Sequence, residues 1–422
     1  MSYIYYEDTE NKISLKIPEE NYIGCVSYKE PKEIQWPENY IHTLKNPCGT
    51  QKLGKIASGK KKVAILVSDY TRAVPVRILL PFLIEELHQA GIHESQIKII
   101  VASGVHRPTT EQEKLQIIGE EWMRKLTIVD HNATNPDMLA FLGKTKRGTP
   151  IWINKLVLES DLRIALGQIE PHEFAGFTGG RKSILPGISG EETIQKNHSP
   201  EMIGHPLARP GILKGNPVHE DMVEVALKVG LDFIVNVVLN KELKIIGVFS
   251  GDMIKAHERG VNFVSSFSKI EITSPPDIIV TTPGKPLNVN LYQSIKALIA
   301  LDAIVHPGSV IVLYSPCPEG LGSEDMLSPF LTATTLKEVT EKLTNNYKIQ
   351  MDHAFLLSKI LEKDVRIIAC IPTVKPEIIK KMMMIPVDSV QEGLDVALKI
   401  SRKNKPSVLV YPQPQRTLPT LT

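Results

Sequence analysis

Cysteine, charge of one sign and long apolar runs are all scarce in this sequence, and each absence excludes a class of protein. The 422 residues include four cysteines and no CxxC pair, which excludes a disulfide framework or a zinc ribbon and indicates a reducing, cytoplasmic compartment. Lys plus Arg number 49 and Asp plus Glu 47, so the net charge of +2 favours neither a nucleic acid nor an acidic membrane surface as a partner. No apolar run approaches the roughly 20 residues of a bilayer span, and the first residues carry no secretory signal.

Two series of short β-rich runs alternate with helical patterns. The first lies at 63–67, 97–101, 126–129 and 162–166, and the second, beyond a polar stretch ending in Ser274-Pro-Pro, lies at 277–280, 309–313, 366–370 and 407–410. Strands that alternate with helices indicate parallel βαβ units, whereas residues 234–248 read as a β-hairpin. We therefore predict an α/β fold of two domains, 1–270 and 271–422, each with a mostly parallel sheet flanked by helices and with the active site in the cleft between them.

Polar residues follow each of the first four predicted strands. In chain order they are Asp69 and Arg72, then His106, then His131, then His172. In open parallel sheets, ligands bind outside the carboxyl ends of the strands, so these side chains are expected at one crevice. The alternative is that the histidines are ordinary surface residues or hydrogen-bonded residues of the core.

The segment from Glu170 to Gly187 is rich in glycine and carries two adjacent cations, Arg181 and Lys182. Glycine allows the backbone to approach a ligand, and exposed N–H groups beside Lys and Arg suit a phosphate or another anion. The segment nearly matches a Walker A loop, but Arg181 stands where that loop needs glycine, and the match begins ten residues after its strand. A plain surface turn is the other interpretation.

Three histidines, His106, His172 and His198, are candidates for metal ligands or proton carriers. None forms the HxxxH or HxH spacing of a hydrolytic zinc site, so they would be gathered from separate loops. In the second half, Tyr292 and Lys296 are four residues apart and share a helical face. They either hold an anionic substrate or face solvent.

Taken together, these residues resemble the nickel-dependent lactate racemase family and its wider set of 2-hydroxy-acid racemases and epimerases. The resemblance runs from residue 69 to 296 and, with the two-domain layout, covers nearly the whole chain. Its motifs occur in the family's order: Asp69-Tyr-Thr-Arg72, Gly104-Val-His106-Arg107, Pro171-His172-x-x-Ala-Gly176-x-Thr-Gly-Gly-x-Lys182, Asn197-His198 and Asn290-Leu-Tyr-Gln293-x-x-Lys296.

The resemblance implies a nickel pincer nucleotide, a pyridinium-3-thioamide-5-thiocarboxylate mononucleotide that holds nickel through two sulfurs and a ring carbon. Lys182 matches the lysine that bonds covalently to this cofactor, and His198 matches the remaining nickel ligand. The other positions that match cofactor-binding motifs are Asp69, Thr71, Gly179 and Gly180. The N-terminal domain would thus bind the cofactor, which maturation enzymes would supply in a transient encounter.

The resemblance also implies a reaction, namely inversion of the C2 centre of a 2-hydroxy carboxylic acid by reversible hydride transfer. His106 and His172 match the two acid/bases, and Arg72 matches a substrate-binding arginine. The second-domain residues that would close over the substrate are Tyr292, Gln293 and Lys296.

Two departures from the family pattern leave the substrate open between lactate and a larger or more polar 2-hydroxy acid. Asn288 stands where an aspartate is often found, and the region from Gln350 to His353 lacks a tryptophan typical of lactate-specific members. His353 itself could contribute to this wall of the site.

Two other kinds of function are compatible with the residues alone. The first is a protein that binds a nucleotide or sugar acid without catalysis, and the second is a hydrolase whose metal is held by His106, His172 and His198.

Overall fold

The computed structural model describes residues 2–8, 13–27 and 30–422, and the chain divides into two compact units. The central unit comprises Glu30–Phe267, and the terminal unit comprises Met1–Lys29 with Ser268–Thr422. The expected boundary near residue 270 lies close to the observed one. Residues before Glu30, however, group with the terminal unit, whereas the predicted first domain begins at residue 1.

The central unit is built on a six-stranded sheet in the order β13-β12-β9-β4-β5-β6. All neighbours are parallel except β12 and β13, which form the antiparallel hairpin expected over 234–248. The strands of this sheet are β4 (Val63–Val67), β5 (Ile97–Val101), β6 (Thr127–Asp130), β9 (Leu162–Gln168), β12 (Phe233–Leu239) and β13 (Ile245–Gly251). Two small antiparallel pairs accompany it, namely β7 (Leu139–Lys144) with β8 (Pro150–Asn154) and β10 (Pro171–His172) with β11 (Gly176–Phe177).

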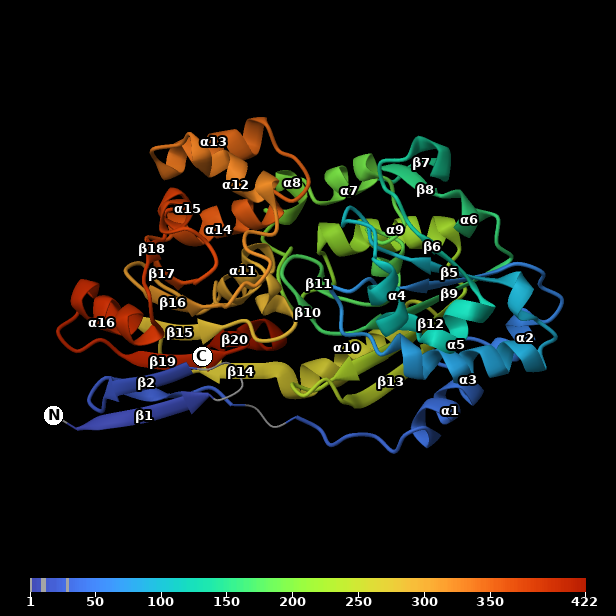
Figure 1. Cartoon of the computed structure of the whole chain (residues 1–422), viewed down its shortest axis with the longest axis horizontal. Helices are drawn as coiled ribbons and strands as arrows, with labels where there is room; N and C mark the ends of the chain where they lie inside the picture. The colour runs from blue at the N-terminus through green and yellow to red at the C-terminus, as the bar shows by residue number, and fades with distance from the viewer. Residues whose placement is uncertain (1, 9–12, 28–29) are drawn as a thin grey trace. The chain divides into compact units, whose positions relative to one another are not determined.

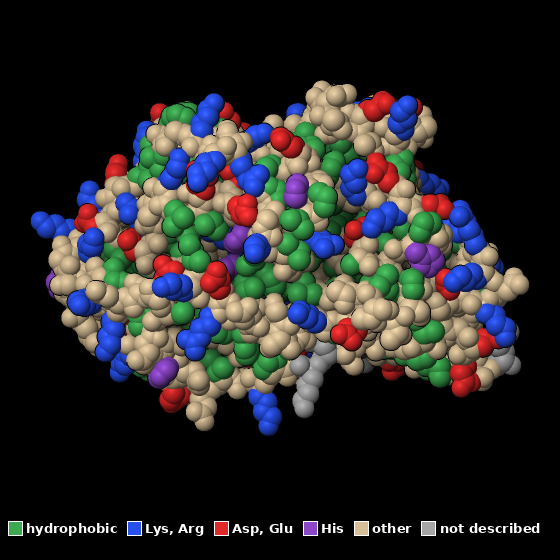
Figure 2. All heavy atoms as spheres, turned by 180° about the vertical axis from the view of Figure 1, so that it is seen from behind, with side chains coloured by type: hydrophobic (Ala, Val, Ile, Leu, Met, Phe, Trp, Pro, Cys, Tyr) green, Lys and Arg blue, Asp and Glu red, His purple; other side chains and the backbone are tan. Residues whose placement is uncertain are grey.

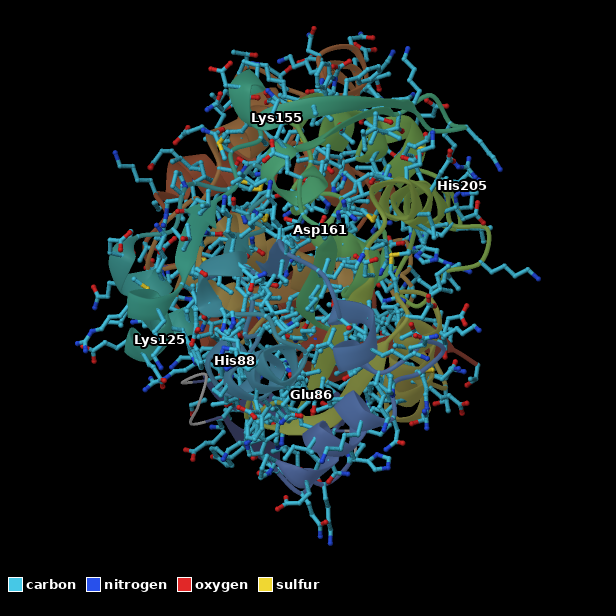
Figure 3. The ribbon with its side chains drawn as sticks, turned by 90° about the vertical axis from the view of Figure 1, so that its right-hand side faces the viewer. Glu86, His88, Lys125, Lys155, Asp161 and His205 are labelled. Carbon is cyan, nitrogen blue, oxygen red and sulfur yellow. The ribbon has the colours of Figure 1, made fainter. Side chains whose placement is uncertain are left out.

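The strand order places a topological switch point between β4 and β9. From β4 the chain moves outward through β5 and β6, then returns to β9 on the other side and continues to β12. The loops that leave β4 and β9 therefore diverge, and at such a point the carboxyl edge of a parallel sheet is the usual place for a ligand. At the opposite edge, Asp161 accepts the backbone N–H groups of Lys61 and Lys62 at 3.0 and 3.1 Å and thus aligns the starts of β4 and β9 (Figure 3).

Helices cover both faces of this sheet (Figure 1). One face forms an apolar core with the first helices of the unit, in which Tyr40, Leu53, Leu80 and Trp122 are buried. On the other face a Cβ added to Gly260 would collide with Ile169, just past β9, and lie 3.1 Å from Phe249 on β13, so α10 packs directly on the sheet. The helices are α1 (Glu38–Lys45), α2 (Leu53–Ala57), α3 (Val76–Gln89), η1 (Glu94–Gln96), α4 (Glu111–Ile118), α5 (Glu120–Lys125), η2 (Pro136–Met138), α6 (Lys155–Leu158), η3 (Gly180–Ser183), α7 (Glu191–Asn197), α8 (Pro200–Ile203), α9 (Pro217–Val229) and α10 (Lys255–Ser268).

The terminal unit contains a second six-stranded sheet, in the order β18-β17-β16-β15-β19-β3, with every neighbouring pair parallel. Its strands are β3 (Tyr22–Cys25), β15 (Ile278–Thr282), β16 (Val310–Tyr314), β17 (Arg366–Cys370), β18 (Ile385–Pro386) and β19 (Val408–Pro412). The antiparallel hairpin β1 (Tyr3–Asp8) and β2 (Ile13–Pro18) and the parallel pair β14 (Lys269–Ile272) and β20 (Leu418–Leu421) complete the strands described in this unit.

The first residues join this unit because β2 buries Ile13, Leu15 and Ile17 in the same core as Ile278 and Val310. Its helical elements are η4 (Leu287–Val289), α11 (Leu291–Ala300), α12 (Glu324–Leu331), α13 (Leu336–Asn345), α14 (Asp352–Glu362), α15 (Pro376–Lys381), α16 (Val390–Ile400) and η5 (Pro414–Arg416).

The predicted α/β fold of two domains with mostly parallel sheets flanked by helices is confirmed. Within the described ranges, no helix is long and apolar enough to cross a membrane. Figure 2 shows basic and acidic side chains interspersed over the face turned to the viewer, in keeping with the near balance of charge in the sequence.

The packing of the N-terminal strands gives a first testable prediction. Ile17 is fully buried, so Ile17→Ala should destabilise the terminal unit by about 3 kcal/mol through lost burial and the cavity left behind. All three tryptophans, Trp36, Trp122 and Trp152, lie in the central unit. Urea unfolding followed by circular dichroism should therefore show an earlier transition, while the transition seen by tryptophan fluorescence moves little.

The matched control is Ile23→Ala on β3, because Ile23 is 49% exposed and should change stability by less than about 1 kcal/mol. An equal shift of both transitions in Ile17→Ala would contradict the assignment of the first residues to the terminal unit.

Candidate active site

The loops after β4 and β5 bring Asp69 and His106 together. Oδ2 of Asp69 lies 2.6 Å from Nδ1 of His106, so the imidazole donates its Nδ1–H to a buried carboxylate. Oδ1 of the same carboxylate accepts the backbone N–H and the hydroxyl of Thr71, at 3.1 and 2.6 Å. This arrangement fixes the ring of His106 and assigns proton exchange with a ligand to its Nε2 atom.

Opposing effects act on the acidity of Asp69. Burial alone would raise the pKa of its carboxyl, but the hydrogen bonds from His106 and Thr71 and the charge of Arg72 lower it below the ordinary value. The carboxylate is therefore ionised throughout the neutral range. The side chain of Arg72 stays at the same loop, where its Nη1 lies 3.4 Å from the carbonyl oxygen of Thr71.

The segment after β9 forms the β10–β11 hairpin, with His172 buried at its turn. Nδ1 of His172 accepts the backbone N–H groups of Phe174 and Ala175, at 3.4 and 3.2 Å. Oε2 of Glu173 also lies 3.3 Å from the same Nδ1. Nδ1 cannot accept from the backbone and donate to Glu173 at once, and because two N–H groups point at it, we assign its hydrogen to Nε2 in this conformation.

Phe174, a residue that the sequence analysis did not single out, lies at the centre of three predicted site residues. Its ring meets those of His172 and His198 edge to face, at centroid distances of 4.7 and 4.9 Å. Nζ of Lys182 lies 5.8 Å from the centroid of the same ring. Phe174 is 2% exposed although it sits in a polar loop, and an apolar aromatic residue at such a place is the signal that could have pointed to it.

His198 is brought to this cluster by the end of α7. It is the C-terminal cap residue of that helix, and its N–H bonds to the carbonyl oxygen of Ile194. The preceding Asn197 is buried and donates its amide to Oδ2 of Asp221 at 2.8 Å. The position of His198 is thus determined by a buried polar contact with α9.

The glycine-rich segment packs tightly against the sheet, whereas an anion-binding role for its glycines stays a prediction. Gly179 and Gly180 have φ angles of +83° and +53°, and a Cβ on Gly179 would lie 2.7 Å from Oδ1 of Asn236. That same oxygen accepts the N–H of Gly180 at 2.9 Å, so this group is not available to a phosphate.

Arg181 is likewise turned inward and is only 1% exposed. Its guanidinium donates to four carbonyl oxygens of the preceding residues, those of Ala175, Phe177, Thr178 and Gly179, at 2.8–3.4 Å. Burial lowers the pKa of Arg181 to about 9, which leaves it charged at neutral pH. The pKa of the adjacent His257 falls well below its ordinary value, through burial first and the charge of Arg181 second.

A backbone contact joins the two groups of site residues. The N–H of Gly104, in the loop that carries His106, donates to the carbonyl oxygen of Gly187 at 3.0 Å. Gly187 in turn donates its N–H to the carbonyl oxygen of Lys182 at 3.1 Å. The structure therefore brings together the predicted residues of the central unit in two connected groups, Asp69–Thr71–His106 and His172–Lys182–His198.

His131 does not belong to either group. It is buried, its Nε2 lies 2.9 Å from the carbonyl oxygen of Ser189, and its Nδ1 lies 3.1 Å from the side-chain amide of Asn154. Burial lowers its pKa to about 4, so it is neutral. For this residue the alternative of a hydrogen-bonded core histidine is the correct one.

The predicted residues of the terminal unit lie on the first turns of α11. Tyr292 donates its hydroxyl to Oδ1 of Asp352 at 3.0 Å and stacks on the ring of His353, with centroids 4.1 Å apart. Lys296 and Gln293 are buried, so the interpretation of Lys296 as a solvent-facing residue is wrong. Asp352 was missed by the sequence analysis, whereas His353 was anticipated as part of this wall.

The start of α11 offers no free N–H groups to an anion, because the chain around it takes them. The N–H groups of Leu291 and Tyr292 donate to the carbonyl oxygens of Gly320 and Leu321, and that of Gln293 donates to the side chain of Asn290. Oε1 of Gln293, by contrast, is buried without a hydrogen-bond partner among the described residues. It is an acceptor suited to a hydroxyl group.

Two families of known protein domains match most of the chain. The lactate racemase N-terminal domain family matches residues 6–211, and the lactate racemase C-terminal domain family matches residues 272–414. A lactate racemase from Thermoanaerobacterium thermosaccharolyticum is 37% identical over 399 residues, which are 93% of each chain. One from Lactiplantibacillus plantarum is 37% identical over 341 residues, which are 80% of each chain.

Two solved structures are similar to this chain. The lactate racemase apoprotein from Thermoanaerobacterium thermosaccharolyticum matches with a TM-score of 0.90 at 35% identity, over 99% of this chain and 100% of that one. A crystal structure of a Thermotoga maritima protein matches with a TM-score of 0.71 over 93% of this chain and all of its own, and at 18% identity it shares the fold.

The Asp69 carboxylate gives a second prediction, on the pH dependence of stability. Because its pKa is lower in the folded state than the roughly 3.9 of an unfolded chain, its contribution is fully present above that value and is lost as the pH falls through the folded pKa. Asp69→Asn should cost about 2 kcal/mol at pH 7. The difference from the unaltered protein should shrink below about pH 4, as measured by urea unfolding with tryptophan fluorescence.

Asp137→Asn is the control, because Asp137 is an exposed aspartate of the same unit. A difference between Asp69→Asn and the unaltered protein that stayed constant down to pH 2 would show that the carboxylate is not stabilised by its partners.

Proposed function

Because the chain belongs to the lactate racemase family, as its motifs predicted, and is therefore an isomerase, we propose that it inverts the C2 centre of a 2-hydroxy carboxylic acid. The observation that carries this proposal is the convergence of His172, Lys182 and His198 on the ring of Phe174. The Asp69–His106 pair, on the neighbouring loop of the same sheet edge, adds a second imidazole with a defined proton-exchanging nitrogen.

The residues present fit a nickel pincer nucleotide better than a bare metal ion. Among the residues that the structure describes, no three His, Cys, Asp or Glu side chains are arranged to hold a metal. A metal that arrives with its own organic ligands needs fewer from the protein, and an imidazole is a suitable ligand for nickel. We therefore propose that His198 ligates the nickel and that Lys182 forms the covalent bond to the cofactor.

This argument also weighs against a hydrolase with a metal held by His106, His172 and His198. Nδ1 of His172 accepts backbone N–H groups and its hydrogen is on Nε2, so in this conformation the ring offers no lone pair to a shared metal ion.

When bound, the cofactor would supply the acceptor and donor of the C2 hydride, and the chain's own residues move the proton. Nε2 of His106 can take the proton of the substrate hydroxyl, because the ionised Asp69 stabilises the imidazolium that forms. His172 is the second proton carrier, which serves the opposite configuration at C2. A planar 2-keto acid is the species from which either enantiomer is restored.

Cationic side chains and one side-chain amide would bind the substrate. Arg72 follows β4 beside Asp69, and a guanidinium can hold a carboxylate with two parallel hydrogen bonds. In the terminal unit, Lys296 supplies a buried positive charge and Oε1 of Gln293 an acceptor for a hydroxyl. These groups recognise what all 2-hydroxy acids share, so lactate and larger members of the class are the substrates to test.

The two histidines give a third prediction. In protein matured with the cofactor, His106→Ala and His172→Ala should each lower kcat for epimerisation by about 100-fold or more, because a proton carrier is lost. Intact mass should still show the cofactor adduct in both variants, since neither residue forms the covalent bond. His88→Ala, on α3 (Figure 3), is the control and should keep full activity. Turnover within twofold of the unaltered protein in both site variants would rule out their role.

Lys182 gives a fourth prediction. Lys182→Ala, coexpressed with the maturation enzymes that make the cofactor, should show no mass adduct and no nickel, because the nucleophilic amine is gone. Lys182→Arg keeps the positive charge but cannot form the same bond, so it should also lack the adduct. Unaltered protein that carries the adduct and turns over none of a panel of 2-hydroxy acids would favour a binding protein without catalysis.

A further inference from the structure

The two acid/base histidines are supported in different ways. Nδ1 of His106 faces a carboxylate oxygen of Asp69 at 2.6 Å. Nδ1 of His172 faces two backbone N–H groups, with a carboxylate oxygen of Glu173 at 3.3 Å. The first arrangement leaves a lone pair on Nε2 of the neutral ring, whereas the second leaves a hydrogen there.

This difference matters because a proton carrier for a hydroxyl group must alternate between two states. It takes the hydroxyl proton on a nitrogen lone pair, becomes imidazolium, and later returns that proton to the carbonyl oxygen of the keto acid. If Nε2 of His172 is the exchanging atom, Nδ1 must keep a hydrogen in both states. That hydrogen needs an acceptor, and backbone N–H groups cannot provide one.

Glu173 is the acceptor at hand. Its side chain is 9% exposed, so little water competes for its carboxylate, and Oε2 is already within 3.3 Å of Nδ1. The backbone hydrogen bonds that hold Nδ1 at present are long, at 3.2 and 3.4 Å, and hydrogen bonds of this length are easily exchanged for a charge-assisted one.

We propose that Glu173 is a positioning residue that accepts the Nδ1–H of His172 in the working site, as Asp69 does for His106. This inference rests on the proposed racemase function and adds a residue to it. The site then contains two carboxylate–imidazole pairs, each of which presents Nε2 to the substrate. A carboxylate thus supports the proton carrier for each of the two configurations at C2.

Arg181 opposes this state through Ala175. Its Nη2 holds the carbonyl oxygen of Ala175 at 2.8 Å, and the N–H of that same residue donates to Nδ1 of His172. Because Arg181 is fully buried and holds four carbonyl oxygens, the turn is a firm support for the resting state, in which the hydrogen sits on Nε2. The balance between Ala175 and Glu173 therefore sets the tautomer of His172.

Variants at Glu173 that differ in acceptor strength test the proposal. Glu173→Gln keeps the shape and a weaker acceptor, whereas Glu173→Leu removes the acceptor. Long-range ¹⁵N–¹H correlation spectra of His-labelled apoprotein should show the population with hydrogen on Nδ1 of His172 falling in the order Glu, Gln, Leu. In cofactor-loaded protein, kcat should fall in the same order, to roughly one tenth and then one hundredth, with KM changed less than about threefold.

Glu192→Gln is the matched control, since Glu192 is a carboxylate of the same unit that accepts the indole N–H of Trp152 and not a site histidine. An unchanged tautomer population, or a kcat of Glu173→Leu within twofold of the unaltered protein, would overturn the proposal. The spectra do not depend on turnover, so a protein that proves inactive on every hydroxy acid would refute the proposed function and still leave the role of Glu173 measurable.

Discussion

The central-unit site depends on a positive charge that is buried in the protein, that of Arg181. Arg181 places its guanidinium beneath the β10–β11 hairpin and holds four carbonyl oxygens of the chain that precedes it. A tight turn of this kind buries more carbonyl groups than its own N–H groups can satisfy, and unsatisfied buried polar groups are costly. The guanidinium of Arg181 satisfies these carbonyl oxygens. The turn that it holds carries His172 and Phe174, and Lys182 follows Arg181 directly in the chain.

The charge state of each buried titratable group in the central unit follows from its neighbours. Asp69 is buried but surrounded by donors, which keeps its carboxyl ionised beside His106. His257 and His131 are buried with a backbone carbonyl oxygen at Nε2, and both are neutral. Imidazole therefore occurs in three settings in one unit: beside a buried carboxylate (His106), at a helix end (His198), and in the core (His131). Neighbours decide between these roles, not residue type.

This dependence on neighbours explains what the sequence could predict. Strands such as β4 and β15 are uninterrupted runs of apolar or β-branched residues, a local pattern that indicates both their type and their place in a buried parallel sheet. The motif residues after them were found because strand ends meet at one edge of such a sheet. The grouping of residues before Glu30 with the terminal unit was not predictable in this way, since it depends on packing between segments more than two hundred residues apart.

The direction in which a polar group points, into the protein or toward a ligand, was the property that the sequence predicted least well. The segment around Gly180 and Arg181 has the glycine and cation content of an anion-binding loop. Its left-handed backbone at Gly179 and Gly180, however, turns the N–H of Gly180 into the protein. The reversal follows from Asn236, a residue on β12 that no local pattern connects to the loop. An oxygen of Asn236 takes the N–H of Gly180 that a phosphate would need, and the loop supports the candidate site residues His172 and Lys182. Glycine and cation content thus show that a segment is tightly turned, and the long-range partner decides which side of the turn faces the ligand.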